Sequence, residues 1–156
     1  MSGYTIVRLK EVEDFAPKFG HSPGMEARFA SRPLELEDAG LGYFRLAPGY
    51  RQPFGHRHKR QEEIYLVVSG SMRIKLDDEI VECKAFDAVR VAPNVVRCPE
   101  GGPNGAELVV FGAPKADTDT EMIADWWTIA AAAQTPPCTR INDPRSTRAR
   151  RKMYLA

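Results

Sequence analysis

The chain has 156 residues, 43% of them apolar, which suits a single domain with one hydrophobic core. Its 22 lysines and arginines nearly balance its 21 aspartates and glutamates, so overall charge does not point to nucleic acid or an anionic membrane as partner. No apolar stretch approaches the roughly 20 residues that span a bilayer, and the N-terminus has no signal-peptide core. Three irregularly spaced cysteines suit free thiols in a reducing compartment, so we expect a cytoplasmic protein.

Short runs rich in β-branched and aromatic residues dominate the chain as far as residue 112. They cover residues 4–9, 41–46, 63–68, 71–76, 87–93 and 107–112. In the fourth run, Met72, Ile74 and Leu76 alternate with basic residues, which is the period of a half-buried strand. Turn signals recur about every ten residues, the strongest being GGPNG at 101–105. This spacing predicts an all-β sandwich or barrel.

One helix is predicted near the end, over about residues 119–133. Thr118 and Glu121 have the spacing of a capping box, alanines follow, and Pro136 would end the helix. We therefore expect the folded domain to occupy residues 1–133.

The last stretch, residues 134–156, differs from the rest in composition. It holds six basic residues and one acidic residue and has little apolar periodicity. We expect a basic, disordered tail without a nucleic-acid partner.

Three candidate metal ligands lie close together in the sequence. His56 and His58 are two residues apart, so on a strand both imidazoles share one face. Glu63 joins that face only if a turn at 59–62 separates two strands, and in that case Glu62 faces away. Two imidazoles and a carboxylate suit a divalent iron, manganese, nickel, zinc or copper ion.

The stretch HRHKRQEEIYLVVSG resembles the first sequence motif of the cupins, in which two histidines, a glutamate and a glycine recur. His56, His58, Glu63 and Gly70 stand at the matching positions. The resemblance covers about residues 40–112. It implies a single small domain, a closed antiparallel jelly-roll barrel, that holds a metal and binds a small molecule. It also implies a homodimer that covers strand edges.

The second cupin motif is degenerate in residues 87–98. Pro93 is kept, but Cys98 stands where the resemblance places a metal-binding histidine. Three alternatives follow for the fourth ligand. Cys98 could bind as a thiolate, three protein ligands could bind with water completing the set, or no metal could bind at all. As a residue on its own, Cys98 also suits a small buried apolar side chain.

Several other residues lie on or beside the presumed site strands and are candidates to line a pocket: Tyr65, Gln61, Arg51 and Tyr43. Tyr65 follows Glu63 by two residues, so it shares the inward face and could donate a hydrogen bond. Arg51 and Arg97 could pair with an anionic substrate or could be solvated.

Two functions remain open at this point. The resemblance implies a metal-dependent enzyme, of dioxygenase or isomerase type, acting on a small molecule. The alternative is a metal-free cupin module that binds a small ligand without catalysis, which the degenerate second motif favours. Neither reading involves a membrane.

Overall fold

The computed structural model describes residues 3–115 and 118–128, and these residues form an almost entirely β structure. Two short 3-10 helices, η1 (Leu9–Glu11) and η2 (Ala16–Phe19), precede the strands. The strands are β1 (Met25–Phe29), β2 (Gly40–Leu46), β3 (Phe54–His58), β4 (Glu62–Leu76), β5 (Glu79–Lys84), β6 (Ala88–Val91), β7 (Arg97–Ala113) and β8 (Thr120–Ala124). Within these residues, no helix is long and apolar enough to cross a membrane.

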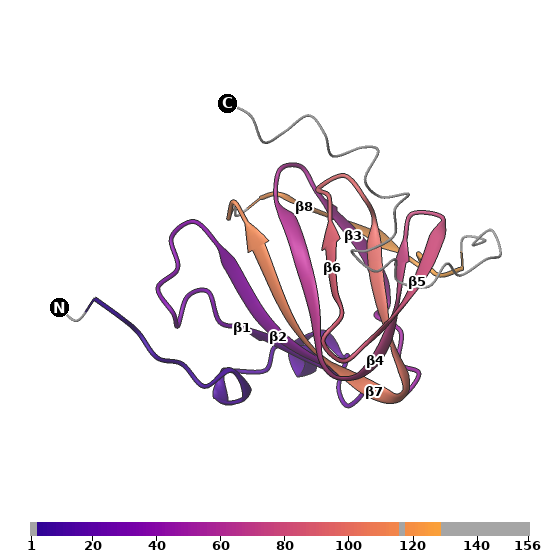
Figure 1. Ribbon diagram of the computed structural model, residues 1–156, viewed down its shortest axis with the longest axis horizontal. Coiled ribbons are helices and arrows are strands. Elements are labelled where there is room, and N and C mark those ends of the chain that lie inside the picture. The colour runs from indigo at the N-terminus through magenta and orange to yellow at the C-terminus, as the bar shows by residue number, and fades with distance from the viewer. Residues whose placement is uncertain (1–2, 116–117, 129–156) are drawn as a thin grey trace.

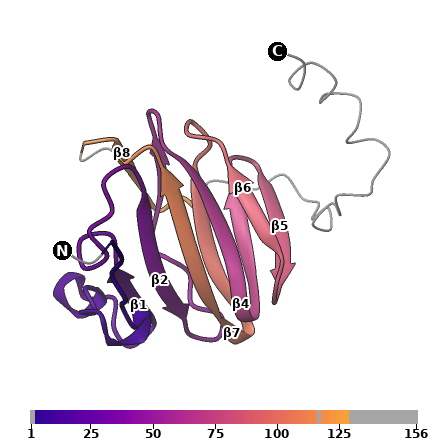
Figure 2. The ribbon, with the colours of Figure 1, turned by 60° about the vertical axis from the view of Figure 1, so that its left-hand side comes forward.

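The strands form one curled antiparallel sheet. Its path runs β1-β2-β7-β3-β8, and β4 pairs with β7 on one side and with β5 and β6 on the other. Figure 2 shows β2, β7, β4, β6 and β5 as one continuous layer, and in Figure 1 β3 and β8 cross behind it. The predicted all-β antiparallel barrel is therefore confirmed.

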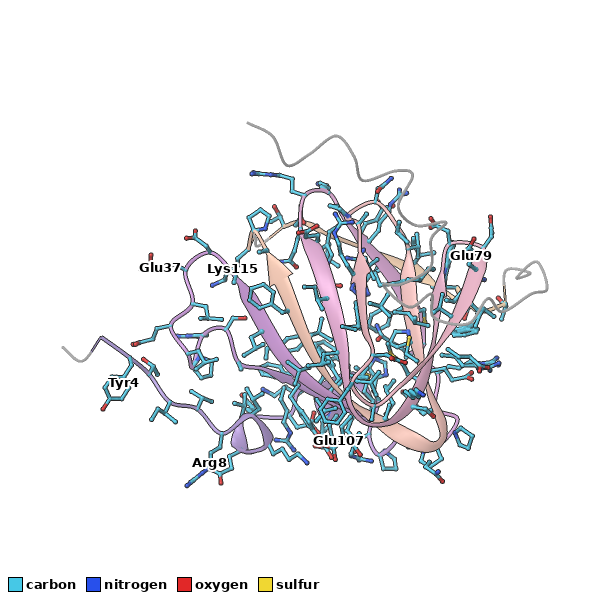
Figure 3. All side chains as sticks on the ribbon, viewed as in Figure 1. Tyr4, Arg8, Glu37, Glu79, Glu107 and Lys115 are labelled. Atoms are coloured by element: carbon cyan, nitrogen blue, oxygen red, sulfur yellow. The ribbon has the colours of Figure 1, made fainter. Side chains whose placement is uncertain are left out.

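The core lies between these layers because side chains alternate along the long strand β4. Glu63, Tyr65 and Val67 are buried in its first half, and Met72 and Ile74 are buried in its second half. The change from odd to even numbers coincides with register shifts in the pairing of β4 with β7, each of which inserts an irregularity into the ladder. Figure 3 shows side chains between the layers, and the labelled Arg8, Glu37 and Glu79 lie on the outside.

Gly70 sits at the bend of β4, where no other residue fits. Its φ is +72°, and a Cβ placed there would lie 2.1 Å from the carbonyl oxygen of Gly105. Gly49 has a similar φ of +66° but has open space around it. The two glycines therefore separate the cost of the backbone conformation from the cost of the close approach.

We expect Gly70→Ala to lower the free energy of unfolding by about 3 kcal/mol, since strain and overlap add together. Gly49→Ala should cost about 1 kcal/mol from the left-handed conformation alone. Urea denaturation of both variants gives the comparison. Equal losses would show that the contact with Gly105 does not matter.

The predicted C-terminal helix is wrong over its described part, because residues 120–124 form strand β8. This strand pairs with β3 along its length, from Phe54 opposite Ala124 to His58 opposite Thr120. The acidic residue of the expected capping box, Glu121, instead forms an ion pair with Arg57 of β3 at 2.8 Å. Pairing with β3 therefore overrides the helical preference that the local sequence pattern of this segment indicates. Residues 129–133 of that helix and the predicted tail, 134–156, lie outside the described residues.

Candidate metal centre and ligand cavity

Two strands bring the candidate ligands together. His56 and His58 lie on β3, the chain turns at 59–61, and Glu63 is the second residue of β4. Asp119, just before β8, holds this turn because its carboxylate accepts hydrogen bonds from the backbone N–H groups of Arg60 at 3.0 Å and Gln61 at 2.8 Å. On one continuous strand, the odd spacing of His58 and Glu63 would direct their side chains to opposite faces. Because a turn separates β3 from β4, both side chains point into the barrel instead.

The three side chains converge on one point. Nε2 of His56 lies 3.5 Å from Oε2 of Glu63, and Nε2 of His58 lies 3.3 Å from Oε1 of the same carboxylate. One ligand atom from each residue lies within 4.8 Å of the others. Nε2 of His58 is buried and has no hydrogen-bond partner among the described residues. Two imidazole nitrogens and a carboxylate at these separations fit a first-row metal ion.

Contacts behind His58 orient its ring for metal binding. Its Nδ1 lies 3.2 Å from the hydroxyl oxygen of Thr120 and 3.5 Å from the carboxylate of Asp119. A metal-binding histidine commonly donates its other ring N–H to a carboxylate, which leaves the remaining nitrogen lone pair directed at the metal. Sequence reasoning missed Asp119 because the residue lies in the segment predicted to be helical.

Arg97 also belongs to the candidate site, which its position in the sequence did not predict. It lies opposite His56 in the pairing of β3 with β7 and is fully buried, so the solvated alternative is wrong. Its Nε donates to Oε2 of Glu63 at 3.0 Å. Its Nη1 donates to the carbonyl oxygens of Pro93 at 3.0 Å and Val95 at 2.8 Å. A fixed positive charge therefore stands beside the one carboxylate of the site.

The surroundings hold each group in the protonation state that a metal site needs. Burial alone raises the pKa of Glu63, but the imidazoles of His56 and His58 and the charge of Arg97 outweigh it, so this pKa is lowered. Burial lowers the pKa of His56 and favours the neutral ring. Burial and the charge of Glu63 raise the pKa of Tyr65, whose hydroxyl donates to Glu63 at 2.8 Å.

Cys98 lies apart from the three candidate ligands. Its Sγ donates to the carbonyl oxygens of Gln52 at 3.1 Å and Phe54 at 3.3 Å, and burial raises the pKa of its thiol to about 12. The physical reason is strand alternation: because Arg97 faces Glu63, its neighbour Cys98 faces the other way. The prediction that Cys98 could complete the site is therefore not met, and Cys98 is a buried small side chain.

A cavity of about 760 Å³ opens beside the three residues. Of the predicted pocket residues, Tyr65 and Gln61 line this cavity, whereas Arg51 and Tyr43 do not. Arg51 forms an ion pair with Glu100, and its guanidinium lies 4.8 Å from the ring centre of Trp127. Tyr43 is buried on the other face of β2, where Nζ of Lys10 lies 5.5 Å from its ring centre. Both miss the cavity because they point away from the barrel interior at that position.

Most of the cavity wall is apolar. Its aromatic and aliphatic members come from η2, β1, β2, β3 and β7 and from the segments beside them. They include Phe15, Phe19, Met25, Phe29, Phe44, Leu46, Phe54, Leu108 and Val110. His21 also lines the cavity, and its ring centre lies 5.9 Å from that of Phe54. The candidate ligands thus form a polar patch in a largely apolar chamber.

The cupin domain family matches the sequence over residues 42–108. No protein of curated function matches the sequence. Among solved structures, a cupin protein from Bacteroides fragilis is 25% identical, with 76% of this chain and 89% of that chain covered and a TM-score of 0.59. A variant of PAC13 from Streptomyces, solved with uridine, is 23% identical, with 79% and 91% covered and a TM-score of 0.59.

Oxalate decarboxylase from Bacillus subtilis is 19% identical, with 83% of this chain but only 35% of that chain covered and a TM-score of 0.65. Likeness at this level shows a common fold. The matched region, 42–108, contains the three candidate ligands and Arg97 but neither the N-terminal part of the cavity wall nor β8. The family match over residues 42–108, the curled antiparallel sheet and the His-His-Glu cluster together support the cupin superfamily for this chain.

Proposed function

We propose that this cupin binds one divalent transition metal through His56, His58 and Glu63 and takes a small molecule into the adjoining cavity. The observation that carries the proposal is the convergence of three ligand atoms within 4.8 Å of one another in the wall of a chamber of about 760 Å³. That volume lies in the range of about 300–1,000 Å³ that is typical of small-molecule sites. The donor set suits iron, manganese, nickel, zinc or copper.

Three protein ligands leave open positions on such an ion, and open positions distinguish catalytic metal sites from closed structural ones. A metal held there would act as a Lewis acid on an oxygen of the bound molecule or would support dioxygen chemistry. This supports an enzyme of dioxygenase or isomerase type. Tyr65 would hold Glu63 in place through its hydroxyl, and Asp119 would orient His58.

A specific observation favours the second candidate, a metal-free module that binds a small ligand without catalysis. Arg97 already compensates the charge of Glu63, and a nearby cation opposes the binding of a second one. In the described part of the chain, no fourth histidine, cysteine or carboxylate joins the cluster. The two candidates differ in whether metal is bound.

Metal content separates them. We expect plasma mass spectrometry to find about one divalent metal per chain in protein purified without a metal-binding tag. His56→Ala should lose the metal, since it removes one of three ligands. Cys98→Ala should keep it, because the Cys98 thiol points away from the site. A parent protein that stays metal-free after reloading with iron, manganese, nickel, zinc and copper in turn would refute the metal site and leave the ligand-binding module.

A further inference from the structure

One part of the cavity wall comes from outside the matched cupin domain. Its apolar members lie in η2, in β1 and just before η2: Phe15, Ala16, Phe19, Met25, Ala27 and Phe29. This N-terminal wall is firmly attached. The carboxylate of Asp14 accepts hydrogen bonds from the N–H groups of Ala16 at 3.0 Å and Ala27 at 2.8 Å, and the N–H of Phe15 donates to the carbonyl of Ala27 at 2.8 Å. The wall is therefore organised before any ligand binds, which favours affinity.

The rings of the N-terminal wall continue into β2 as an edge-to-face series. Phe15 and Phe29 have ring centres 5.6 Å apart at 67°, and Phe29 and Phe44 have centres 5.7 Å apart at 82°. Aromatic pairs prefer this arrangement, and an inserted ring can join it. Phe29 is nevertheless 50% exposed and Phe19 is 67% exposed. Large apolar side chains left exposed around a cavity mark a surface that a ligand covers.

The charges around the cavity restrict the ligand further. Among the described residues that line it there is no lysine and no arginine, and Glu63 is the one carboxylate. Arg97 lies behind Glu63 and does not reach the cavity wall. A molecule with several negative charges would lose its hydration without gaining a cationic side chain. Of the polar side chains in the wall, those of His56, His58 and Glu63 converge, with one ligand atom from each within 4.8 Å of the others. Ser31 and Gln61 also line the wall, but they hydrogen-bond to the backbone of Leu41 and Pro114.

We propose that the cavity binds an uncharged aromatic molecule with a single hydroxyl or carbonyl oxygen, and that the N-terminal wall selects it. The rings lie against Phe29 and its neighbours, and the oxygen lies at the three candidate ligands. The position of the oxygen rests on the proposed metal site, whereas the apolar part of the site does not depend on metal. This ligand class differs from oxalate, the molecule in the name of one structural neighbour.

The apolar part is tested with N-phenyl-1-naphthylamine, an uncharged fluorescent probe, on the full chain after treatment with EDTA. We expect about one bound probe per chain, displaced by 2-naphthol and not by oxalate. Phe29→Ser should weaken probe binding at least about tenfold, because burial of a phenylalanine contact contributes this much. Phe111→Ser is the matched control, because Phe111 is 42% exposed but does not line the cavity, and it should leave binding unchanged.

Phe19→Ser provides a second variant at an exposed position of the same wall and should also weaken binding. Equal losses in Phe29→Ser and Phe111→Ser, or displacement by oxalate as effective as that by 2-naphthol, would overturn the proposal. A protein that binds metal but no probe would also overturn it while leaving the metal site standing.

The oxygen end is tested with metal-loaded protein. 2-Naphthol should displace the probe at lower concentration than naphthalene does, and His56→Ala should remove that difference. Probe binding without any metal binding would refute the proposed function and, with it, the placement of the oxygen. If the protein does hold metal and 2-naphthol and naphthalene displace the probe equally well, only the placement of the oxygen is refuted.

Discussion

Replacing Arg97 with methionine is expected to lower the free energy of unfolding of the metal-free protein by about 3–5 kcal/mol, the cost of leaving a buried charge uncompensated. Arg97 is fully buried, and its Nε lies 3.0 Å from Oε2 of Glu63. Methionine keeps the length and apolar stem of the side chain, so the loss reports on the charge rather than on a cavity. Urea denaturation after EDTA treatment measures it.

Two further variants identify the cause. Arg97→Met combined with Glu63→Gln removes both charges and should recover most of the stability, since a neutral pair leaves no unpaired ion. Arg73→Met is the matched control: Arg73 also pairs with a glutamate, Glu100, but its side chain is 38% exposed, so we expect a loss of about 1 kcal/mol or less. Similar losses in Arg97→Met and Arg73→Met would contradict the argument from burial.

The single variant Arg97→Met, which should lower stability, should at the same time strengthen metal binding. A positive charge next to Glu63 opposes a divalent cation at the same carboxylate, so its removal should tighten metal binding. Competition against a fluorescent chelator measures the affinity of Arg97→Met relative to the parent. Weaker metal binding in Arg97→Met would instead show that Arg97 holds the carboxylate of Glu63 in position for the metal. Stability and metal affinity thus report separately on one residue.

Asp119→Ala is expected to weaken metal binding by about 10–100-fold, the usual effect of removing the group that orients a metal-binding histidine. The carboxylate lies 3.5 Å from Nδ1 of His58 and also accepts the hydrogen bonds of the 59–61 turn. The substitution therefore frees the ring and loosens the turn that directs Glu63 inward. The chelator competition described for Arg97→Met gives the affinity.

Two companion variants separate these effects. Asp119→Asn keeps an acceptor for the turn but loses the negative charge beside His58, so its affinity should fall between those of the parent and Asp119→Ala. Glu121→Ala removes the next acidic residue on the same segment, whose partner is the exposed Arg57, and should leave metal binding unchanged. An equal loss in Glu121→Ala would show that β8 as a whole, rather than Asp119, supports the site.

The main features of the fold and the centre of the candidate site could be predicted from the sequence because they depend on short-range patterns. Alternation over 71–76 predicts a half-buried strand, and Met72 and Ile74 are indeed buried. The spacing of His56, His58 and Glu63 allows convergence only across a turn, which the structure has at 59–61. Such features follow from the period of a strand and the geometry of a turn, and neither requires knowledge of distant segments.

The rest depended on pairing between distant segments, which local patterns do not encode. Alternation requires that residues 97 and 98 face opposite ways, but only the register of β7 against β3 and β4 turns Arg97 inward and Cys98 away. Residues 120–124 favour a helix in isolation, and the hydrogen bonds and ion pair offered by β3 outweigh that preference. The N-terminal wall likewise joins the cavity only because β1 pairs with β2, and so the character of the ligand chamber was decided by the tertiary structure.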